Sequence, residues 1–415
     1  MENLWSKIYR LPMLTKKRNL RTGRPVWLAH RQESIPASEL TTDKKTEVVI
    51  IGAGISGAMV AEELSSLGFK IIMLDERGPL KGSTVASTAL LQYEIDEPLS
   101  LLSKKIGNEK AVRAWRRSKL GVDNLAAKIE SLNIDCDYTT RHALYLAGNK
   151  LNAAELKKEW QARNHAGLYS EYLNAQALKE KHGIDRAAAL KSFGNISADP
   201  MKLAGALLMK TINNGGQIFA PCKATSIEHS GGLVHIKTKS GPVVSAKHVI
   251  FATGYQIPKY IDHKAYKITS TWAIATRPQK RQLWPEECFV WEASDPYLYL
   301  RTTIDGRIVC GGEDEEFADA EERDAKIPAK TRKLEQKLKK LFPGIDTKAE
   351  YSWAGCFGVS PTSLPKIGKL PGHKNCYAIM GLGGNGITFS RIGAELIRAE
   401  LTGNPDPDAD LFRID

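Results

Sequence analysis

A short glycine-rich segment has the spacing that brings backbone against a phosphate group. Gly52 would permit a tight turn, Gly54 would let the backbone approach the phosphate, and Gly57 would let a helix pack closely on a strand. A helix that begins at Ile55 and Ser56 would direct its free N–H groups and the positive end of its dipole at the same anion. The spacing therefore predicts a site for the diphosphate of a dinucleotide.

Strand-forming sequences flank this turn on both sides. Residues 48–51 and 71–74 are apolar β-formers, as expected of strands buried on both faces of a sheet. Asp75 ends the second run, where a carboxylate can bind a ribose hydroxyl and disfavours a 2′-phosphate. Three glycines alone are a weak signal, so the strands, the helix and the acid carry most of the specificity. Together they favour NAD or FAD binding over an ordinary strand-to-helix turn.

A second glycine-dense turn lies near the C-terminus. Residues 381–386 read GLGGNG and would form a loop almost without side chains, against which a flat ring can lie. The helix after Ile387 could direct its N–H groups at an electron-rich carbonyl edge, such as a reduced flavin offers. Between the two turns, residues 248–255 (HVIFATGY) read as another strand of the first sheet. The second turn favours FAD, and a turn that serves only chain reversal is the alternative.

The motifs resemble those of the flavin-dependent amine and amino-acid oxidase family, which includes glycine oxidase, sarcosine oxidase and D-amino-acid oxidase. The resemblance extends from about Thr46 to Leu401, and the layout is most similar to the γ-glutamylputrescine-oxidase-like bacterial members. It rests on these segments, in matching order: VVIIGAGISG, LDERG, GSTVAST, ISADPMKLAGALL, VIFATGY, YLRTTIDGRIVCGGED, WAGCFGVSPTSLPKIG and GLGGNGIT. The resemblance implies an α/β fold in which a Rossmann-like FAD-binding domain is interleaved with a substrate domain built on a mostly antiparallel sheet.

The same resemblance divides the chain into interleaved parts. The first part of the substrate domain would be helical, and the second, rich in Trp, Tyr and Pro, would form strands. The expected parts are an N-terminal arm (1–43), the FAD-binding domain (44–105, 195–262 and 352–415) and the substrate domain (106–194 and 263–351). Partial disorder is the alternative for the arm.

The resemblance also indicates which positions would bind FAD. They follow the two glycine turns, the GSTVAST loop and the strand ends between them. The expected residues are Gly52, Gly54, Ile55, Ser56, Gly57, Asp75, Glu76, Arg77, Ser83, Thr84, Ser87, Thr88, Ala89, Ala224, Gly254, Tyr255, Gly383, Gly384, Asn385, Gly386, Ile387 and Thr388. The chain departs from the family near Ser87 and Thr88, where an Asn-Gly pair is usual.

The substrate side departs further from the family pattern. Phe357 stands where glycine-oxidase-like members carry the arginine that clamps an α-carboxylate, and Thr388 stands where sarcosine oxidase has a lysine. Arginine suits that task because its fork pairs with both carboxylate oxygens. Arg301, near Tyr299, could replace the missing cation, and a surface or ion-paired strand arginine is the alternative. We expect Tyr299, Arg301 and Phe357 at the reacting end, and a primary or secondary amine, or an amino acid recognised differently, as substrate.

The implied reaction is FAD-dependent oxidation of the C–N bond of a small amine or amino acid to an imine. The flavin supplies the difficult chemical step. The protein binds the flavin, orients the substrate and excludes water. Molecular oxygen is the expected acceptor, with hydrogen peroxide as product. The alternatives are a flavin dehydrogenase that uses a quinone or a protein acceptor, an enzyme acting on a modified tRNA base, and a non-catalytic flavin-binding subunit.

Composition narrows the partners and the location. The 415 residues carry a formal charge of +12, but the excess is dispersed and no nucleic-acid-binding motif accompanies it, so nucleic acid is an unexpected partner. Apolar runs are too short for a bilayer span or a signal peptide, so we expect a cytoplasmic protein with no transmembrane segment. The six cysteines include no CxxC pair and the nine histidines lack metal-ligand spacing, so no metal is expected. Cys356 lies near the position at which sarcosine oxidase tethers its flavin, although a buried free thiol is the commoner outcome.

Overall fold

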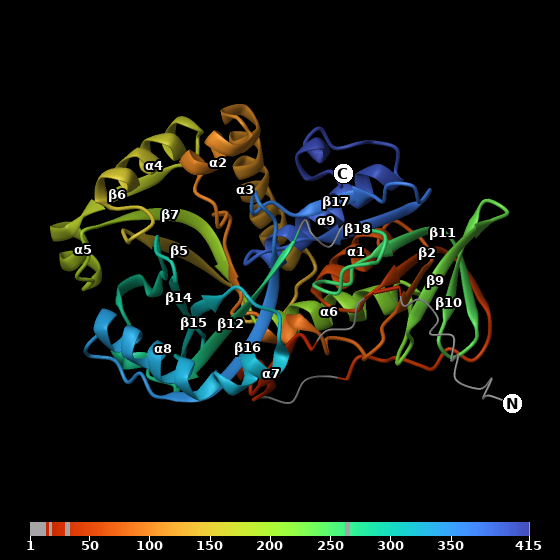
Figure 1. Cartoon of the computed structure of the whole chain (residues 1–415), viewed down its shortest axis with the longest axis horizontal. Coiled ribbons are helices and arrows are strands. Elements are labelled where there is room, and N and C mark those ends of the chain that lie inside the picture. The colour runs from red at the N-terminus through yellow and green to blue at the C-terminus, as the bar shows by residue number, and fades with distance from the viewer. Residues whose placement is uncertain (1–13, 16–18, 30–33, 262–265, 415) are drawn as a thin grey trace, which may run out of the picture.

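A computed structural model describes residues 14–15, 19–29, 34–261 and 266–414. Most of the predicted N-terminal arm, including residues 1–13, 16–18 and 30–33, lies outside the described residues. Two sheets lie beside each other, each covered by helices (Figure 1). The helices of the described chain are α1 (Ile55–Ser65), α2 (Leu99–Ile106), α3 (Asn108–Ser131), α4 (Ala153–His165), α5 (Ala175–His182), α6 (Pro200–Asn213), α7 (Ala320–Ala325), α8 (Ile327–Leu341) and α9 (Gly386–Leu401).

The first sheet has eight strands within the described residues. Its order is β17 (Lys366–Lys369), β18 (Cys376–Met380), β11 (Val243–Phe251), β2 (Lys44–Ile51), β3 (Ile71–Leu74) and β8 (Gln217–Phe219), and β10 (Leu233–Thr238) joins β9 (Ala224–Ser230) to β11. The central strand β2 runs parallel to both neighbours, with Val49 opposite Val249 and Ile72. The prediction that residues 248–255 add a strand to this sheet is thus confirmed.

Alternation along β2 explains why its four apolar residues are all buried. Val48 and Ile50 pack into one hydrophobic cluster with the helices, whereas Val49 and Ile51 pack into a second cluster on the opposite face. Successive side chains of a strand point to opposite faces, so a strand covered on both sides must be apolar throughout. This strand delivers Gly52 to the carboxyl edge of the sheet.

The second sheet has ten strands in the same described ranges and is mostly antiparallel. Its order is β1 (Arg21–Gly23), β16 (Ala349–Val359), β12 (Lys267–Thr276), β15 (Ile308–Glu315), β14 (Leu298–Thr302), β13 (Phe289–Glu292), β5 (Thr139–Leu146), β7 (Ala188–Ser197) and β4 (Leu90–Leu91), with β6 (Ser170–Asn174) on β7. Only β13 and β5 pair in parallel among these described strands. The predicted α/β fold with a mostly antiparallel second sheet is confirmed.

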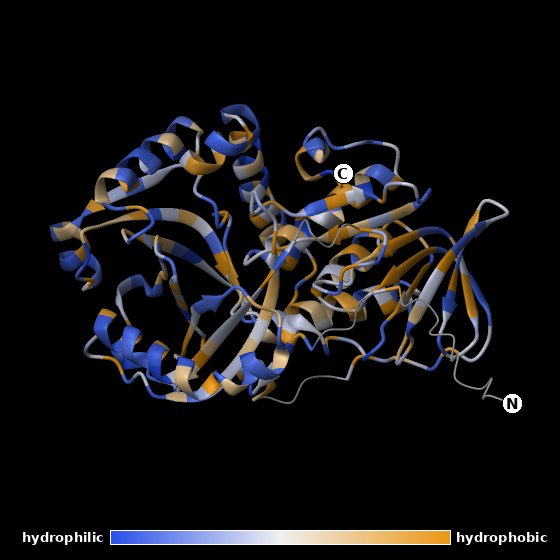
Figure 2. Ribbon diagram, viewed as in Figure 1, coloured by the Kyte–Doolittle hydropathy of each residue, from blue (hydrophilic) through white to orange (hydrophobic). Residues whose placement is uncertain are grey.

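The basic segment near residue 330 forms α8, which packs on the second sheet. Leu334, Leu338 and Leu341 are buried in the cluster under that sheet, and the rest of α8 is largely hydrophilic (Figure 2). This is the usual pattern of a helix with one buried stripe and a solvated face. Solvation therefore explains the exposed lysines of α8, whereas Lys330 is buried and forms ion pairs with Glu313 and Glu315.

The division of the strands between the two sheets does not coincide with the predicted domain boundaries. The boundary at 351/352 falls inside β16, all of which belongs to the ten-stranded sheet, and β4 in the predicted first FAD-binding part pairs with β7. The boundaries themselves stay a prediction. Among the described residues, no helix combines the length and apolarity that crossing a bilayer requires.

Candidate active site

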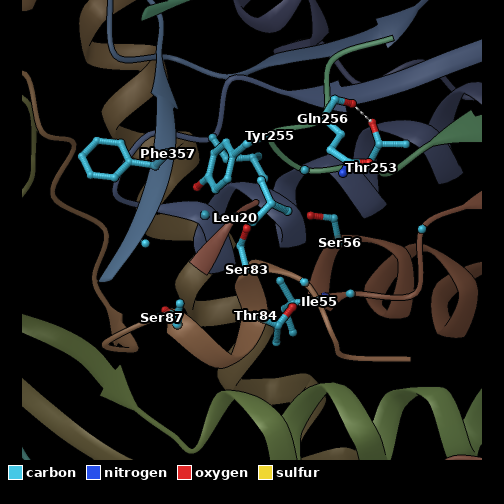
Figure 3. Close-up of a pocket in the computed structure, with 18 of the residues that line it drawn as sticks. Leu20, Ile55, Ser56, Ser83, Thr84, Ser87, Thr253, Tyr255, Gln256 and Phe357 are labelled. Carbon is cyan, nitrogen blue, oxygen red and sulfur yellow. Dashed lines mark hydrogen bonds between the residues drawn. The ribbon is translucent and has the colours of Figure 1, made fainter. Parts of the chain in front are cut away.

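A cavity of about 230 Å3 is lined by residues from both sheets and by both glycine turns. The first turn contributes Gly52 and Gly54, and the second contributes residues 382–387. Figure 3 shows the pocket extending from Ser56 at the start of α1 to Phe357 on β16. Segments more than 300 residues apart in the chain therefore meet at one site.

Close packing of strand and helix explains the glycines of the first turn. Gly52 has φ +114°, a conformation that side chains disfavour, and a Cβ at Gly57 would lie 1.9 Å from the carbonyl oxygen of Gly52. The helix α1 can therefore begin directly against the strand end. Its first amide donor, the N–H of Ile55, donates to Oγ1 of Thr84 at 3.0 Å, while the other first-turn amides have no intrahelical acceptor.

Asp75 lies on the cavity wall, and its carboxylate also orders the turn around it. Oδ2 accepts from the N–H of Ala53 at 2.8 Å, and Oδ1 accepts from the N–H groups of Arg77 and Gly78 at 2.8 and 2.9 Å. A carboxylate has about four acceptor positions, so these bonds leave capacity for a ribose hydroxyl. The predicted ribose contact remains a prediction.

Two tryptophans hold the GSTVAST loop against the cavity. The indole N–H of Trp27 donates to the carbonyl of Ser87 at 2.7 Å, and that of Trp353 donates to the carbonyl of Ala86 at 2.9 Å. Trp353 is 1% exposed and lies behind the loop, outside the residues that line the cavity. Ser83, Ser87 and Thr88 of the loop line the cavity.

The C-terminal turn is held by contacts with three other segments. The N–H of Gly383 donates to the Gly358 carbonyl on β16 at 3.0 Å, and the hydroxyl of Tyr255 donates to the Gly383 carbonyl at 3.0 Å. The N–H of Gly384 donates to Oδ2 of Asp96 at 3.0 Å. These bonds fix the turn as a bare backbone surface facing the cavity.

Most of the predicted site residues lie in this cavity. Those that line it are Gly52, Gly54, Ile55, Ser56, Asp75, Glu76, Arg77, Ser83, Thr84, Ser87, Thr88, Ala89, Ala224, Gly254, Tyr255, Tyr299, Phe357, Gly383, Gly384, Asn385, Gly386 and Ile387. Gly57 lies one layer behind, where it packs α1 on β2. The structure gives the position of each residue on the cavity wall, and the role of each residue in FAD binding stays a prediction.

Arg301 and Thr388 are not among the lining residues. The Arg301 guanidinium is 2% exposed and donates to the carbonyls of Ala89 and Ala198 at 2.6 and 3.0 Å. It is therefore neither a substrate-facing cation nor a surface arginine, and it joins two backbone segments behind the site. Thr388 is also buried, and its hydroxyl donates to the Gln92 carbonyl at 2.9 Å.

Several lining residues were absent from the sequence predictions. Asp96, Thr271, Tyr297 and Trp291 lie at the end of the cavity that contains Phe357. From the sequence, Trp291 could line the cavity or pack in the core, and the structure places it on the cavity wall; the other three belong to no motif. Only the family resemblance could have indicated these residues, and it covers the motifs better than the parts of the cavity wall that lie between them.

A second cavity of about 220 Å3 adjoins the first. Both are lined by Asp96, Trp291, Tyr297 and Phe357. Beyond this junction, the second cavity is lined by Asp314 and by further acidic residues from β13, β15 and the loops that follow them. The two cavities therefore share a wall of aromatic and acidic residues.

Burial raises the pKa of two carboxyl groups near this junction. Burial raises the pKa of Asp314 to about 7, although hydrogen bonding from Thr271 and Tyr297 opposes the shift. Burial also raises the pKa of Asp96, against the hydrogen bond from the Gly384 N–H. Perturbed carboxyl groups that line a cavity are typical of functional sites.

Unpaired polar atoms on the cavity wall test whether a dinucleotide with a flavin fits. Oγ of Ser83, Oε1 of Gln92 and Nε2 of Gln256 are covered, and each lacks a hydrogen-bond partner among the described residues. Buried polar groups are normally paired, so their presence on a cavity wall fits a ligand with many donors and acceptors. FAD is such a ligand. The described ranges contain no group of three or more His, Cys, Asp or Glu residues arranged to hold a metal ion.

Comparison with known proteins establishes the class. The family model described as DAO, FAD dependent oxidoreductase, matches residues 47–400. The chain belongs to this family, and FAD is its cofactor.

Individual relatives are distant in sequence but cover most of the chain. A probable oxidoreductase, OrdL, from Haemophilus influenzae is 24% identical over 396 residues, covering 92% of this chain and 89% of that protein. The crystal structure of glycine oxidase from Geobacillus kaustophilus has a TM-score of 0.74 at 18% identity, covering 90% of this chain and 99% of that one. L-proline dehydrogenase from P. horikoshii also has a TM-score of 0.74, at 19% identity, covering 89% and 97%. These structures share the fold.

Proposed function

We propose that this protein uses FAD to oxidise the C–N bond of a small amine to an imine. The observation that carries the proposal is that both glycine turns line one cavity whose far end is lined by aromatic side chains. Several relatives of the same fold or family are named as oxidising amino acids, including glycine oxidase from Bacillus licheniformis. The site is suited to the same class of bond.

The chain offers a binding surface for each part of FAD. The start of α1, with Ser83 and Thr84 beside it, would hold the diphosphate, because free amides and hydroxyls are good donors to phosphate oxygens. Asp75 would bind the ribose next to the adenine. The C-terminal turn at 381–386 would lie against the ring, with α9 directed at its carbonyl edge. When bound, FAD accepts the hydride equivalent that leaves the carbon next to the substrate nitrogen.

The protein's own residues would bind the substrate and keep water out. Phe357 and Tyr255 lie near each other on the cavity wall (Figure 3), and Tyr299 lines the same cavity. Burial raises the pKa of Tyr255 and of Tyr299, so both phenols remain neutral donors at working pH. Because only the neutral amine can lose a hydride, the substrate nitrogen must give up its proton before the oxidation.

The charges at the cavity end next to the C-terminal turn favour an amine over an ordinary α-amino acid as substrate. Arg77 and Lys223 are the cations among the described residues of the first cavity, and both lie beside Asp75 and Ala224, at the predicted adenosine end. Phe357 contributes no charge at the reacting end, and Thr388 and Arg301 do not reach it. Within the described residues, an α-carboxylate placed beside the ring would therefore find no guanidinium or ammonium group to pair with it.

Spectroscopy of the purified protein tests the proposal. We expect a yellow protein whose flavin absorbance is bleached by an amine without oxygen and restored by air, with one hydrogen peroxide formed per amine consumed. Bleaching without peroxide would instead indicate a dehydrogenase that uses a quinone or a protein acceptor. An FAD-loaded protein that no amine or amino acid bleaches would refute the proposed reaction.

A further inference from the structure

The fold compensates only part of the negative charge that lines the second cavity. Three of its acidic residues form ion pairs outside the cavity: Glu292 with Arg186 (3.2 Å), Glu315 with Lys330 (2.7 Å) and Glu316 with Lys267 (3.0 Å). Three others, Asp96, Asp295 and Asp314, have no ion-pair partner among the described residues. Lys150 is the one cation among the described residues that line this cavity, and its charge acts on Asp96, where it lowers the carboxyl pKa against the effect of burial.

Polar atoms in the same wall lack partners. Oδ1 of Asp314 exposes less than 1 Å2 and has no hydrogen-bond partner in the described part of the chain, although Asp314 as a residue is only half-buried. The indole Nε1 of Trp291, which lines both cavities and is 5% exposed, also lacks a partner in the described part of the chain. Its N–H is a donor and an ammonium group offers no acceptor, so Oδ1 of Asp314 is the atom that indicates a cation. Unpaired buried polar atoms on a cavity wall are expected where a ligand supplies the missing partner.

The aromatic residues where the two cavities meet provide a surface that suits an alkyl chain. Trp291 stacks on Tyr145 with ring centroids 3.8 Å apart and planes at 19°, and Phe357 and Tyr297 line the same junction. Aromatic surfaces bury methylene groups favourably and also attract cations through their faces. The wall therefore provides apolar contact along the way and carboxylate oxygens at its far end.

We propose that the second cavity binds the distal ammonium group of a dicationic amine, with Asp314 as its principal anionic contact. This rests on the proposed function, because it places the reacting nitrogen of the same molecule beside the C-terminal turn. Asp96 lines both cavities and so lies between the two amino groups, whereas Asp314 lines the second cavity alone. The substrate class is then an amine with a second positive charge several bonds from the carbon that is oxidised.

Binding can be measured without turnover. Calorimetric titration of the FAD-loaded protein, with its flavin already reduced and oxygen excluded so that no amine is oxidised, would compare α,ω-diaminoalkanes of three to six carbons with n-alkylamines of the same lengths. We expect the best diamine to bind at least tenfold more tightly than its matched monoamine. The variant Asp314→Asn should lose most of this advantage, and Asp314→Glu should retain part of it. Glu321→Gln removes an exposed charge on α7 outside both cavities, and it should leave the diamine preference intact.

The two proposals fail in distinguishable ways. Equal binding of diamine and monoamine, or an unchanged preference in a folded, flavin-loaded Asp314→Asn protein, would overturn the distal site. A diamine that binds through Asp314 but never bleaches the flavin would overturn the proposed oxidation and support the distal site. Bleaching by monoamines and diamines with equal kcat/KM would support the oxidation and overturn the distal site.

Discussion

Ser56 and Ser390 are 334 positions apart in the chain, and their hydroxyl oxygens lie 2.6 Å apart in the buried contact between α1 and α9. Ser56 lies in the first turn of α1 and Ser390 in the second turn of α9. The contact therefore brings the N-termini of two helices to one cavity. Each N-terminus presents free amides and the positive end of a helix dipole. A ligand that is anionic at one end and electron-rich at the other suits this arrangement.

Replacing Gly57 with alanine should prevent α1 from approaching β2. The new Cβ would lie 1.9 Å from the Gly52 carbonyl oxygen, so the helix must move. Overpacking of this kind costs about 1–3 kcal/mol. We expect thermal unfolding at a lower temperature and purified protein with little FAD. Gly344→Ala is the matched control, because a Cβ there meets open space, and it should keep normal stability and flavin content.

Replacing Tyr255 with phenylalanine should loosen the C-terminal turn without emptying the cavity. The variant loses the bond to the Gly383 carbonyl, which is worth about 1 kcal/mol, and it keeps the ring. FAD should bind about fivefold more weakly, as measured by fluorescence titration of the apoprotein. Tyr169→Phe, at a tyrosine that is 66% exposed, should bind FAD normally. Unchanged FAD affinity in the Tyr255 variant would show that this bond does not hold the turn.

Arg301 should matter for stability and not for substrate choice. Replacing it with glutamine leaves the carbonyls of Ala89 and Ala198 short of a buried donor, at a cost of about 1–3 kcal/mol for each carbonyl left unpaired. We expect a lower denaturation midpoint with an unchanged ratio of kcat/KM between amines and amino acids. Arg332→Gln removes an exposed arginine and should change neither quantity. A shift in substrate preference caused by Arg301→Gln would revive the idea of a substrate-facing cation.

The motifs reveal the cofactor side of the site far better than the substrate side. Gly52, Gly57 and the turn at 381–386 could be interpreted from the sequence because each satisfies a local backbone requirement next to a strand or a helix. Arg301 could not, because its role depends on carbonyls that reach it from two distant segments. Asp314 was missed for a related reason: its significance comes from burial and from the lack of an ion pair, which only the folded chain determines.

The affinity for a dicationic amine should rise with pH through about 7. Burial raises the pKa of the Asp314 carboxyl to about 7, so this group is mostly neutral at pH 6 and mostly ionised at pH 8. The groups that act on it are the hydroxyls of Thr271 and Tyr297, which lower its pKa with Lys330, and Asp96, which raises it. The ionised fraction changes about tenfold between pH 6 and pH 8, and affinity should follow it.

The raised pKa of Asp314 should also make the stability of the unliganded protein fall with pH, whereas diamine affinity rises with pH. An unfolded aspartic acid ionises near pH 4, whereas folded Asp314 ionises near pH 7, so the unfolded state loses its proton first. Asp314 therefore destabilises the unliganded protein increasingly as pH rises from about 4 to 7, and the penalty is constant above that. Asp314→Asn should remove this dependence and flatten the binding profile. Identical pH profiles of unfolding and binding in both proteins would contradict the assignment.

A positive charge at position 357 should reverse the substrate preference. Phe357 lines both cavities, so Phe357→Arg places a guanidinium at the junction between the reacting end and Asp314. The new cation should repel a dicationic amine and pair with an α-carboxylate, because arginine binds carboxylates through two parallel hydrogen bonds. We expect kcat/KM for diamines to fall at least tenfold and oxidation of α-amino acids to increase, measured by flavin bleaching without oxygen. Phe357→Leu keeps the apolar surface without charge and should preserve the diamine preference. Equal losses for diamines and monoamines in the arginine variant would show that size, and not charge, determines the effect.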